Sequence, residues 1–416
     1  MEENEIIIQG RQGKEAAAAM AGLSISVRNR ALLGMAEALR RRKDEILAAN
    51  SMDMEAGRLN GLTASLLDRL LLTPERVEGM ASGLEDLAEL EDPLGQVHKM
   101  WQRPNGLSIA RVTVPLGLVA MIYEARPNVT VEAAGLCVKT GNAVLLKGSS
   151  TAHESNLKLA EVLKEGAGMD LPANSIQIIA SRERESVNVL MKMNQYVDVI
   201  IPRGGAGLIS AVVSNSTVPV IETGVGNCHA YVDEDADFQM ALEIIINGKT
   251  QRPSVCNALE KVLVHEKIAG DFLPLLEKAL VEKQVEIRAC KASLPYFTEA
   301  RLLTEEELYE EYLDYIIGVI LVKDVEAAAA HINRYGSRHS EVIITDSYMN
   351  GRSFQHLVDS ACVYHNASTR FSDGAEFGFG AEIGISTQKM HARGPMGLEA
   401  LTSIKYLING DGQVRP

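Results

Sequence analysis

A single cysteine, Cys256, ends the turn-rich segment Asn247-Gly-Lys-Thr-Gln-Arg-Pro-Ser-Val-Cys256. The segment follows an apolar helical run, 240–246, and precedes a strand-like run, 261–265. A thiol on a turn beside Lys249 and Arg252 would lie in electropositive surroundings, which favour its thiolate. A thiolate among glycine-rich segments able to hold a dinucleotide predicts redox chemistry on an acyl group, with Cys256 as the nucleophile.

The other cysteines are weaker candidates, because most cysteines are small buried hydrophobic residues. Cys137 and Cys362 lie in apolar runs, and Cys290 lies in a polar stretch without catalytic neighbours. Cys228 beside His229 is the rival nucleophile, although adjacent residues on a strand point to opposite faces. Five widely spaced cysteines without a C-x-x-C pair indicate reduced thiols and argue against a zinc site.

The composition excludes several classes of protein. The chain has 416 residues, 46% hydrophobic and 23% charged, which is typical of a globular protein of roughly two or three domains. It carries 41 basic and 55 acidic residues, a net charge of -14, and such a surface repels nucleic acid. No signal peptide and no apolar run of membrane-spanning length is recognisable, so we expect a soluble, cytoplasmic protein.

Three glycine-rich segments follow strand-like runs and could hold a dinucleotide. The first brings Lys147 to the carboxyl end of a buried strand, where ligands bind in parallel sheets, but a lysine that only extends its ammonium to solvent fits equally well. The second, Ile201-Pro-Arg-Gly-Gly-Ala-Gly207, lacks the last glycine of the dinucleotide fingerprint, yet it can seat an anion before a helix. The third contains Gly224 and Glu222, and the fingerprint would assign Glu222 to a ribose hydroxyl.

Two alternations of strands and helices must position these residues. The first runs from strand 117–123 to strand 218–221, and the second runs from strand 230–232 to strand 341–345. Both predict parallel sheets covered by helices. Helices are predicted between residues 14 and 90, and Pro104-Asn-Gly106 joins the strands of a projecting β-hairpin. We expect an α/β protein with domains 1–225 (including hairpin 96–114), 226–365 and 366–416.

A polar, glycine-rich passage covers residues 366–397. Its length inside a compact domain is typical of a functional loop. Three phenylalanines argue against disorder: Phe371, Phe377 and Phe379. We therefore expect an ordered loop that faces the substrate. His391 could be a general base, but redox acyl transfer can proceed without one, and a structural role is favoured. The acidic segment 305–311 is expected to be exposed.

Together these residues resemble the aldehyde dehydrogenase superfamily over nearly the whole chain. The most specific segments are Glu124-Ala-Arg-Pro-Asn128, Ile201-Pro-Arg-Gly-Gly205, Glu222-Thr-Gly-Val-Gly-Asn-Cys-His229, Gln251-Arg-Pro-Ser-Val-Cys256 and His391-Ala-Arg-Gly-Pro395. The resemblance implies an aldehyde dehydrogenase-like fold: two Rossmann-like α/β domains plus a small β oligomerisation element, formed by the hairpin and strand 403–408. Within the superfamily, the chain most resembles one branch. The enzymes of that branch reduce L-glutamyl 5-phosphate to L-glutamate 5-semialdehyde, with release of phosphate, in proline biosynthesis.

The resemblance also implies roles for single residues. Cys256 matches the nucleophile that forms a thioacyl intermediate, and Asn128 matches the asparagine that binds the oxyanion together with the Cys256 amide. Glu222 matches the general base of the oxidising enzymes, which removes its ribose-binding role. Lys147 matches the lysine at the adenine ribose. The remaining cofactor-binding residues are Ser149, Ser150, Arg203, Gly204, Gly205 and Gly224.

One difference from the superfamily bears on the cofactor. Three residues after the ribose lysine, many NAD enzymes carry a glutamate that would repel a 2′-phosphate, whereas this chain has Ser150. The site should therefore accept NADPH, with positive charge from Lys147 and Arg203. No metal is expected. Arginine suits carboxylate and phosphate geometry, so the candidate substrate-binding residues are Arg126, Arg252, Ser254, Arg370 and Arg393.

Two alternatives remain open on the sequence. One is an NAD-dependent aldehyde dehydrogenase that hydrolyses the thioester with Glu222 as base and needs no phosphate. The other is a noncatalytic nucleotide-binding scaffold that docks on a kinase of the same pathway, which would leave the Cys256 segment unexplained. The resemblance implies a homodimer or homotetramer, and a contact with glutamate 5-kinase is left open.

Overall fold

A computed structural model describes residues 4–415, which divide into two compact units. Unit 1 comprises the residues up to Glu222, residues 378–384 and the segment from Met396; unit 2 comprises Thr223–Phe377 and Ile385–Pro395. The predicted domains differ from these units after residue 365: unit 2 continues to Phe377, and beyond it alternate segments belong to the two units. Within residues 4–415, no helix is long and apolar enough to cross a membrane.

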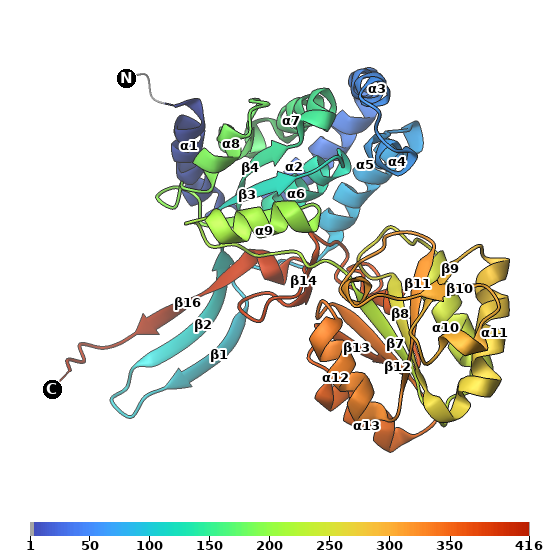
Figure 1. Cartoon of the computed structure of the whole chain (residues 1–416). Coiled ribbons are helices and arrows are strands. Elements are labelled where there is room, and N and C mark those ends of the chain that lie inside the picture. The colour runs from blue at the N-terminus through green and yellow to red at the C-terminus, as the bar shows by residue number, and fades with distance from the viewer. Residues whose placement is uncertain (1–3, 416) are drawn as a thin grey trace. The chain divides into compact units, whose positions relative to one another are not determined.

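Unit 1 contains a four-stranded parallel sheet in the order β5-β4-β3-β6. All of β3 is buried, because helices cover both faces of a parallel sheet. The strands are β3 (Leu118–Tyr123), β4 (Ala143–Gly148), β5 (Ile176–Ile178) and β6 (Val199–Arg203), and the helices between and after them are α6 (Asn128–Lys139), α7 (His153–Ala167), α8 (Glu185–Leu190) and α9 (Ala206–Asn215) (Figure 1).

Five helices precede this sheet; the predicted helical region is present, but its first helix begins at Glu5, before the predicted start at residue 14. In α2 the buried residues Leu32, Met35 and Leu39 recur at helical spacing. Helix α5 begins where the Thr73 hydroxyl accepts a hydrogen bond from the Arg76 amide, a common N-cap arrangement. The helices are α1 (Glu5–Met20), α2 (Ile25–Arg41), α3 (Lys43–Leu59), α4 (Ala64–Leu70) and α5 (Pro74–Glu89).

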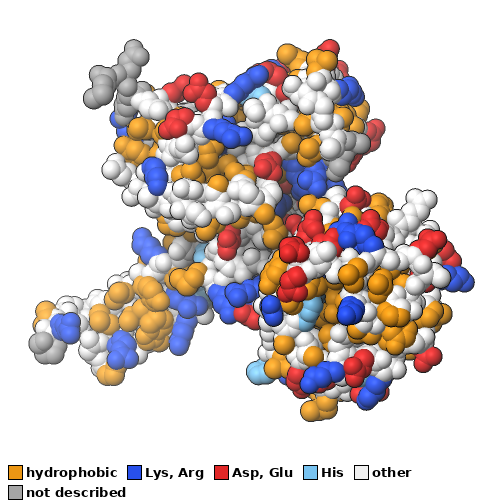
Figure 2. Space-filling view, viewed as in Figure 1, with side chains coloured by type: hydrophobic (Ala, Val, Ile, Leu, Met, Phe, Trp, Pro, Cys, Tyr) orange, Lys and Arg blue, Asp and Glu red, His pale blue; other side chains and the backbone are white. Residues whose placement is uncertain are grey.

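A separate antiparallel sheet extends from the rest of unit 1 (Figure 1). The predicted hairpin is present as β1 (Val97–Gln102) and β2 (Ser108–Pro115). The predicted last strand is β16 (Thr402–Asn409), which pairs with the other edge of β2 in the order β1-β2-β16. Several large apolar side chains on it are exposed, and Figure 2 shows hydrophobic side chains gathered there: Val97, Met100, Ile404, Tyr406, Leu407 and Ile408.

Unit 2 is built on a seven-stranded parallel sheet in the order β10-β9-β11-β8-β7-β12-β13. The Asp237 carboxylate caps α10 by accepting from the Met240 amide. The strands are β7 (Cys228–Val232), β8 (Leu259–His265), β9 (Glu286–Ala289), β10 (Ala300–Leu302), β11 (Ile316–Val322), β12 (Ser340–Ile344) and β13 (Cys362–His365), and the helices are α10 (Phe238–Thr250), α11 (Ala269–Glu282), α12 (Val325–Tyr335) and α13 (Tyr348–Leu357).

The structure corrects two predicted elements. Segment 218–221 forms only an isolated bridge between Val220 and Ile200, because Pro219 has no N–H to donate to a ladder. Helix α10 continues past the predicted turn at Asn247 to Thr250. Gly248 lets this part of the helix pack closely on β8, because a Cβ there would lie 2.6 Å from the Leu259 side chain.

The passage 366–397 contains short elements that the sequence did not predict. A 3-10 turn covers Thr369–Phe371, and a two-residue antiparallel ladder joins β14 (Ile385–Ser386) to β15 (Gly394–Pro395). The three phenylalanines named above are each partly exposed. His391 has a positive φ of 64°, an uncommon conformation for a residue other than glycine.

Candidate active site

Cys256 lies in the connection between α10 and β8 of unit 2 and is partly exposed. The backbone of Gly226 packs directly on it. A Cβ added to Gly226 would lie 1.4 Å from the Cys256 carbonyl oxygen and 2.6 Å from the Cys256 Cα. A glycine is therefore required at position 226, and this contact fixes the backbone that carries the thiol.

The Gly226 amide is held from the other side by Glu311. Its N–H donates to Glu311 Oε1 over 2.7 Å. The sequence predicts that the acidic segment 305–311 is exposed, and this is wrong for Glu311 and for Glu307, whose side chain is 12% exposed. A local charge pattern could not identify Glu311, because its partner lies 85 residues away in the sequence.

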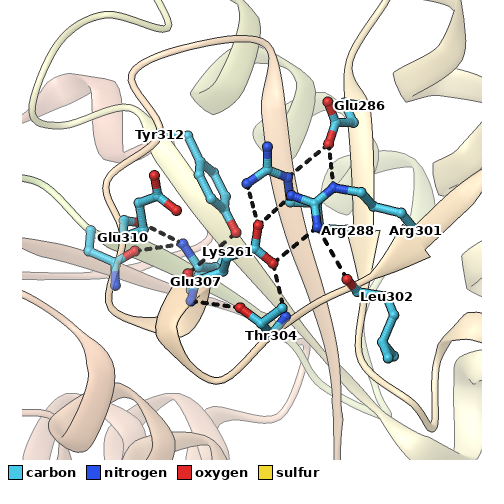
Figure 3. Close-up of polar contacts among 10 residues, drawn as sticks. Lys261, Glu286, Arg288, Arg301, Leu302, Thr304, Glu307, Glu310 and Tyr312 are labelled. Carbon is cyan, nitrogen blue, oxygen red and sulfur yellow. Dashed lines mark hydrogen bonds and ion pairs between the residues drawn. The ribbon is translucent and has the colours of Figure 1, made fainter.

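Lys261 ties the same two segments together from the sheet beneath them (Figure 3). Its Nζ donates to Asn227 Oδ1 over 3.0 Å and to the Glu310 carbonyl over 2.8 Å. The ammonium also lies 3.9 Å from the centre of the Tyr312 ring, a favourable cation–π distance. Burial lowers the pKa of Lys261 to about 7, although the neighbouring Glu260 carboxylate opposes the change. Lys261 was not predicted from the sequence.

An arginine–glutamate cluster completes this support (Figure 3). Arg288 Nη1 lies 2.7 Å from Glu307 Oε1, and Arg301 also pairs with Glu307. The other oxygen of Glu307 accepts from the Thr304 amide over 2.9 Å. These bonds lower the pKa of Glu307 to about 2, against the effect of its burial. The segment that carries Glu310 and Glu311 is thereby fixed to the edge of the sheet.

Lys249 does not provide the positive surroundings that the sequence predicts for Cys256. It is fully buried on α10, and its Nζ pairs with Glu260 Oε2 over 2.9 Å. Burial lowers the pKa of Lys249 and raises that of Glu260, while their attraction opposes both changes. The lysine is buried because the helix extends to Thr250 and turns this side chain toward the sheet.

Arg370 lies within electrostatic range of Cys256, and Arg252 lies within electrostatic range of Arg370. Burial lowers the pKa of Arg370, and the charge of Cys256 opposes this while the charge of Arg252 adds to it. Arg370 Nε donates to Gln251 Oε1 over 2.9 Å, which orients the guanidinium. The positive charge observed near Cys256 therefore comes from Arg370, in the passage after residue 366, whereas the sequence predicts it from Lys249 and Arg252.

Cys228 is fully buried, unlike Cys256. Its thiol donates to the Cys256 carbonyl over 3.2 Å and lies 3.8 Å from Nδ1 of His339. Burial raises the pKa of Cys228 well above its usual range, so it is a poor source of thiolate. The neighbouring His229 instead places its Nδ1 2.9 Å from the Asn227 carbonyl. Cys228 thus supports the Cys256 backbone and has the properties of a structural thiol.

The candidate substrate-binding residues in the passage 366–397 have different surroundings. Arg393 and Lys389 both pair with Asp359, over 2.9 and 2.7 Å, and these two partners lower the pKa of Asp359 to about 2. Arg370 lies near Cys256, as described above, whereas Arg393 is held by a carboxylate. Gly224 donates its N–H to the Ile385 carbonyl, and a Cβ there would lie 2.2 Å from the Thr387 side chain.

The predicted cofactor residues of unit 1 lie at the carboxyl ends of its parallel strands. Lys147 Nζ, at the end of β4, donates to the Ser181 carbonyl over 2.9 Å. Ser149 accepts from the Thr151 amide and Ser150 is exposed. At the end of β6, the Gly205 amide donates to Glu124 Oε2 over 2.8 Å, and a Cβ at Gly204 would lie 2.6 Å from the Glu124 carboxyl carbon.

The predicted oxyanion and base residues also belong to unit 1. Asn128 begins α6, and its side-chain amide donates to Glu132 Oε1 over 2.7 Å. Glu222 is the last residue of the first segment of unit 1, and Arg126 precedes α6. The roles of these residues stay predictions.

Residues 2–291 match the sequence model of the Aldehyde dehydrogenase family. The chain belongs to this family. It is 57% identical to the gamma-glutamyl phosphate reductase of Moorella thermoacetica and 55% identical to that of Clostridium perfringens, over 99% of this chain and at least 99% of each relative. The crystal structure of the gamma-glutamyl phosphate reductase from Thermotoga maritima has a TM-score of 0.97 at 45% identity, and the match covers 99% of this chain and 100% of that one.

These similarities confirm the predicted family and, within it, the predicted branch of gamma-glutamyl phosphate reductases. They also confirm the α/β aldehyde dehydrogenase-like fold with parallel sheets. The relatives that are 55% and 57% identical are gamma-glutamyl phosphate reductases.

Proposed function

We propose that this chain reduces L-glutamyl 5-phosphate to L-glutamate 5-semialdehyde with NADPH, releasing phosphate, as a step of proline biosynthesis. The observation that carries the proposal is the full-length likeness to gamma-glutamyl phosphate reductases, at 57% identity over 99% of the chain. The properties of the two neighbouring thiols support it: Cys256 is partly exposed on a fixed backbone, and Cys228 is buried.

The residues of unit 1 suit a dinucleotide. The Gly205 amide lies at the amino end of α9, where backbone N–H groups can bind an anion; the Glu124 carboxylate takes this place in the structure, so a pyrophosphate would have to replace it. Gly204 packs against the same Glu124 carboxyl group and against Leu208, so a Cβ there would clash with both. When bound, NADPH supplies a hydride to the acyl group. The unit 1 residues proposed to hold it are Lys147, Ser149, Ser150, Arg203, Gly204 and Gly205; Gly224, also named from the sequence, belongs to unit 2.

Cys256 carries the covalent chemistry in this proposal. Its thiolate attacks the γ-acyl carbon, a C–S bond forms, the C–O bond to the phosphate breaks, and phosphate leaves with the bonding electrons. After hydride addition to the thioester, the C–S bond breaks and the semialdehyde is released. Asn128 and the Cys256 amide stabilise the oxyanion in both steps, and losing one such donor typically lowers the rate by about 10²–10³. No water attacks, so Glu222 has the task of moving a proton at the thiol.

Two arginines are the best candidates for the phosphate of the substrate. Arg370 acts electrostatically on Cys256, Arg252 acts on Arg370, and a guanidinium matches phosphate by paired hydrogen bonds. The α-carboxylate of the substrate is assigned to the remaining candidates, Arg126, Ser254 and Arg393. Arg393 would have to share its guanidinium with Asp359 to do so.

The antiparallel sheet of unit 1 supports the proposed assembly into a homodimer or homotetramer. Met100, Tyr406 and Ile408 are 65%, 55% and 60% exposed, and large apolar side chains in such a cluster favour contact with another subunit. Trp101 packs edge-on against Tyr406, which stiffens the sheet that carries them. A contact with glutamate 5-kinase has no comparable support.

A spectrophotometric assay tests the proposal. NADP reduction by L-glutamate 5-semialdehyde should require inorganic phosphate, because the thioester is released by phosphate and not by water. Cys256→Ala should abolish turnover, and Cys290→Ala, which removes another partly exposed thiol of unit 2, should retain it. Turnover without phosphate would overturn the proposal in favour of hydrolysis, and turnover by Cys256→Ala would exclude Cys256 as the nucleophile.

A further inference from the structure

Residues 368–372, which carry Arg370, are bound to the Cys256 turn by buried polar side chains of the same unit. Thr369 is fully buried, and so, to within 4% exposure, is Asn257, the residue that follows Cys256. These two residues are 112 positions apart in the sequence. Buried polar side chains are nearly always hydrogen-bonded, so their partners indicate what holds Arg370 near the thiol.

Asn257 makes the central contacts with this segment. Its Nδ2 donates to the Ser372 carbonyl over 2.9 Å and to the Arg370 carbonyl over 3.3 Å. Its own carbonyl accepts from the Thr369 hydroxyl over 2.7 Å. Because Asn257 is bonded directly to Cys256, any displacement of the segment from Asn257 changes the position of Arg370 relative to the thiol. Asn257 thus joins the backbone of Cys256 to the backbone of the arginine.

Two further groups of contacts fix the ends of the segment. Ser368 Oγ donates to Asn247 Oδ1, on α10, over 2.7 Å. Ser372 Oγ lies 2.6 Å from both Ser340 Oγ and Tyr364 Oη, which belong to β12 and β13. The segment is therefore tied to a helix at one end and to the sheet at the other, with the bonds of Asn257 between them.

Arg370 keeps its positive charge available at this position. Its Nε donates to the side-chain amide oxygen of Gln251, a neutral partner, over 2.9 Å. The Asp373 carboxylate acts on Arg370 electrostatically, but it also accepts from the amides of residues 375 and 376, over 2.9 and 3.5 Å. A guanidinium has five N–H donors, so the bond to Gln251 orients Arg370 and leaves donors for an anion.

We propose that Asn257 and Thr369 are positioning residues for the phosphate of the substrate, because they hold the Arg370 guanidinium in a fixed place beside the Cys256 thiol. This inference rests on the proposed function, which makes Arg370 a candidate for the phosphate. The phosphorus lies two bonds from the carbon that the thiol attacks, so the group that binds phosphate must keep a fixed distance from the sulfur. The hydrogen bonds of Asn257 and Thr369 supply that constraint.

Steady-state kinetics of the phosphate-dependent reaction test the inference. L-glutamate 5-semialdehyde is oxidised with NADP while the concentration of inorganic phosphate is varied. Thr369→Val keeps the size of the side chain but leaves the Asn257 carbonyl without its donor, so the KM for phosphate should rise about fivefold or more. The kcat at saturating phosphate and the KM for NADP should each change by less than about twofold. Thr369→Ser keeps the hydroxyl and should keep the wild-type KM for phosphate.

A second measurement needs no turnover. Inorganic phosphate bound by Arg370 should slow the alkylation of Cys256 by iodoacetamide, because an anion beside the thiol disfavours its thiolate. The phosphate concentration that halves the alkylation rate should rise in Thr369→Val by the same factor as the KM. It should rise at least as much in Asn257→Ala, which loses the donor to two carbonyls.

Ser293→Ala is the matched control, because it also removes a buried hydroxyl of unit 2 that donates to a backbone carbonyl, that of Val319 on β11. It should leave both phosphate measurements unchanged. Wild-type values in Thr369→Val, or an equal change in Ser293→Ala, would overturn the inference. Equal rises in the KM for phosphate and for NADP, or wild-type alkylation that is insensitive to phosphate, would also overturn it. Wild-type turnover without phosphate would instead refute the proposed function, and the alkylation measurement would still decide on the inference.

Discussion

Gly226→Ala should disable Cys256 without disturbing the cofactor residues of unit 1. The added Cβ would lie 1.4 Å from the Cys256 carbonyl oxygen, whereas an ordinary contact begins near 3.4 Å. The Cys256 backbone must therefore move by about 2 Å, because the contacting atoms are backbone and have no rotamer to change. The Glu311 bond to the Gly226 amide opposes a compensating shift on the glycine side.

The expected size of the effect follows from this displacement. A reacting atom misplaced by about 1 Å typically costs about 10²-fold in rate, so turnover should fall by at least that factor. That factor corresponds to roughly 2.7 kcal/mol in the activation free energy. The loss should appear in kcat, and NADPH should bind to unit 1 as it does in the wild type.

Two measurements separate a local effect from general unfolding. The first is NADPH-dependent turnover, and the second is the rate at which iodoacetamide alkylates Cys256. Gly270→Ala is the control, since it lies in α11 of the same unit and an added Cβ would meet nothing within 4 Å. It should keep full activity and stabilise its helix by up to about 1 kcal/mol. Wild-type turnover and alkylation in Gly226→Ala would refute the reasoning.

Three other predictions concern the same unit. Mass spectrometry of the native chain after brief iodoacetamide treatment should find Cys256 modified and Cys228 intact; the opposite labelling would make Cys228 the nucleophile. Glu311→Ala should change the alkylation rate of Cys256 more than Glu311→Gln, which keeps an oxygen to accept from the Gly226 amide, and equal effects would contradict this positioning role. Burial raises the pKa of Glu341 from 4.5 to about 8, so the folded chain keeps a proton that the unfolded chain loses, and the unfolding free energy should fall as pH rises through that window. Glu341→Gln cannot ionise and should remove this slope, at most about 1.4 kcal/mol per pH unit, in urea titrations at several pH values; an unchanged slope would contradict it.

The parallel sheets could be predicted because their strands are simple in sequence. The runs that form β3 and β4 are almost wholly apolar and buried, and the turns between elements contain glycine or proline. Strands β9 and β10, at one side of the larger sheet, were missed for the converse reason. Strand β9 has the sequence Glu-Ile-Arg-Ala and β10 has only three residues, so neither presents a pattern that differs from a polar loop.

Site residues could be predicted only where the side chain is itself reactive, whatever its partners in the fold. Cys256 could be chosen because a thiol beside cations is unusual, but its supports could not. Lys261 and Glu311 look like ordinary surface charges in the sequence, and their roles come from partners 34 and 85 residues away. Lys249 was misassigned because two further residues of helix rotate a side chain by about 200°, which turns a solvent-facing cation into a buried one.

The pairing of β2 with β16 has a consequence for how the chain folds during synthesis. Ser108 is the partner of Asn409, so this ladder closes a loop of about 300 residues. Contacts between such distant segments form slowly, and β2 keeps one unpaired edge until they do. The nascent chain therefore exposes an unpaired edge of β2, which can pair with strands of other chains, through most of its translation. We expect chaperones that mask exposed β edges to bind the hairpin until β16 has paired with β2.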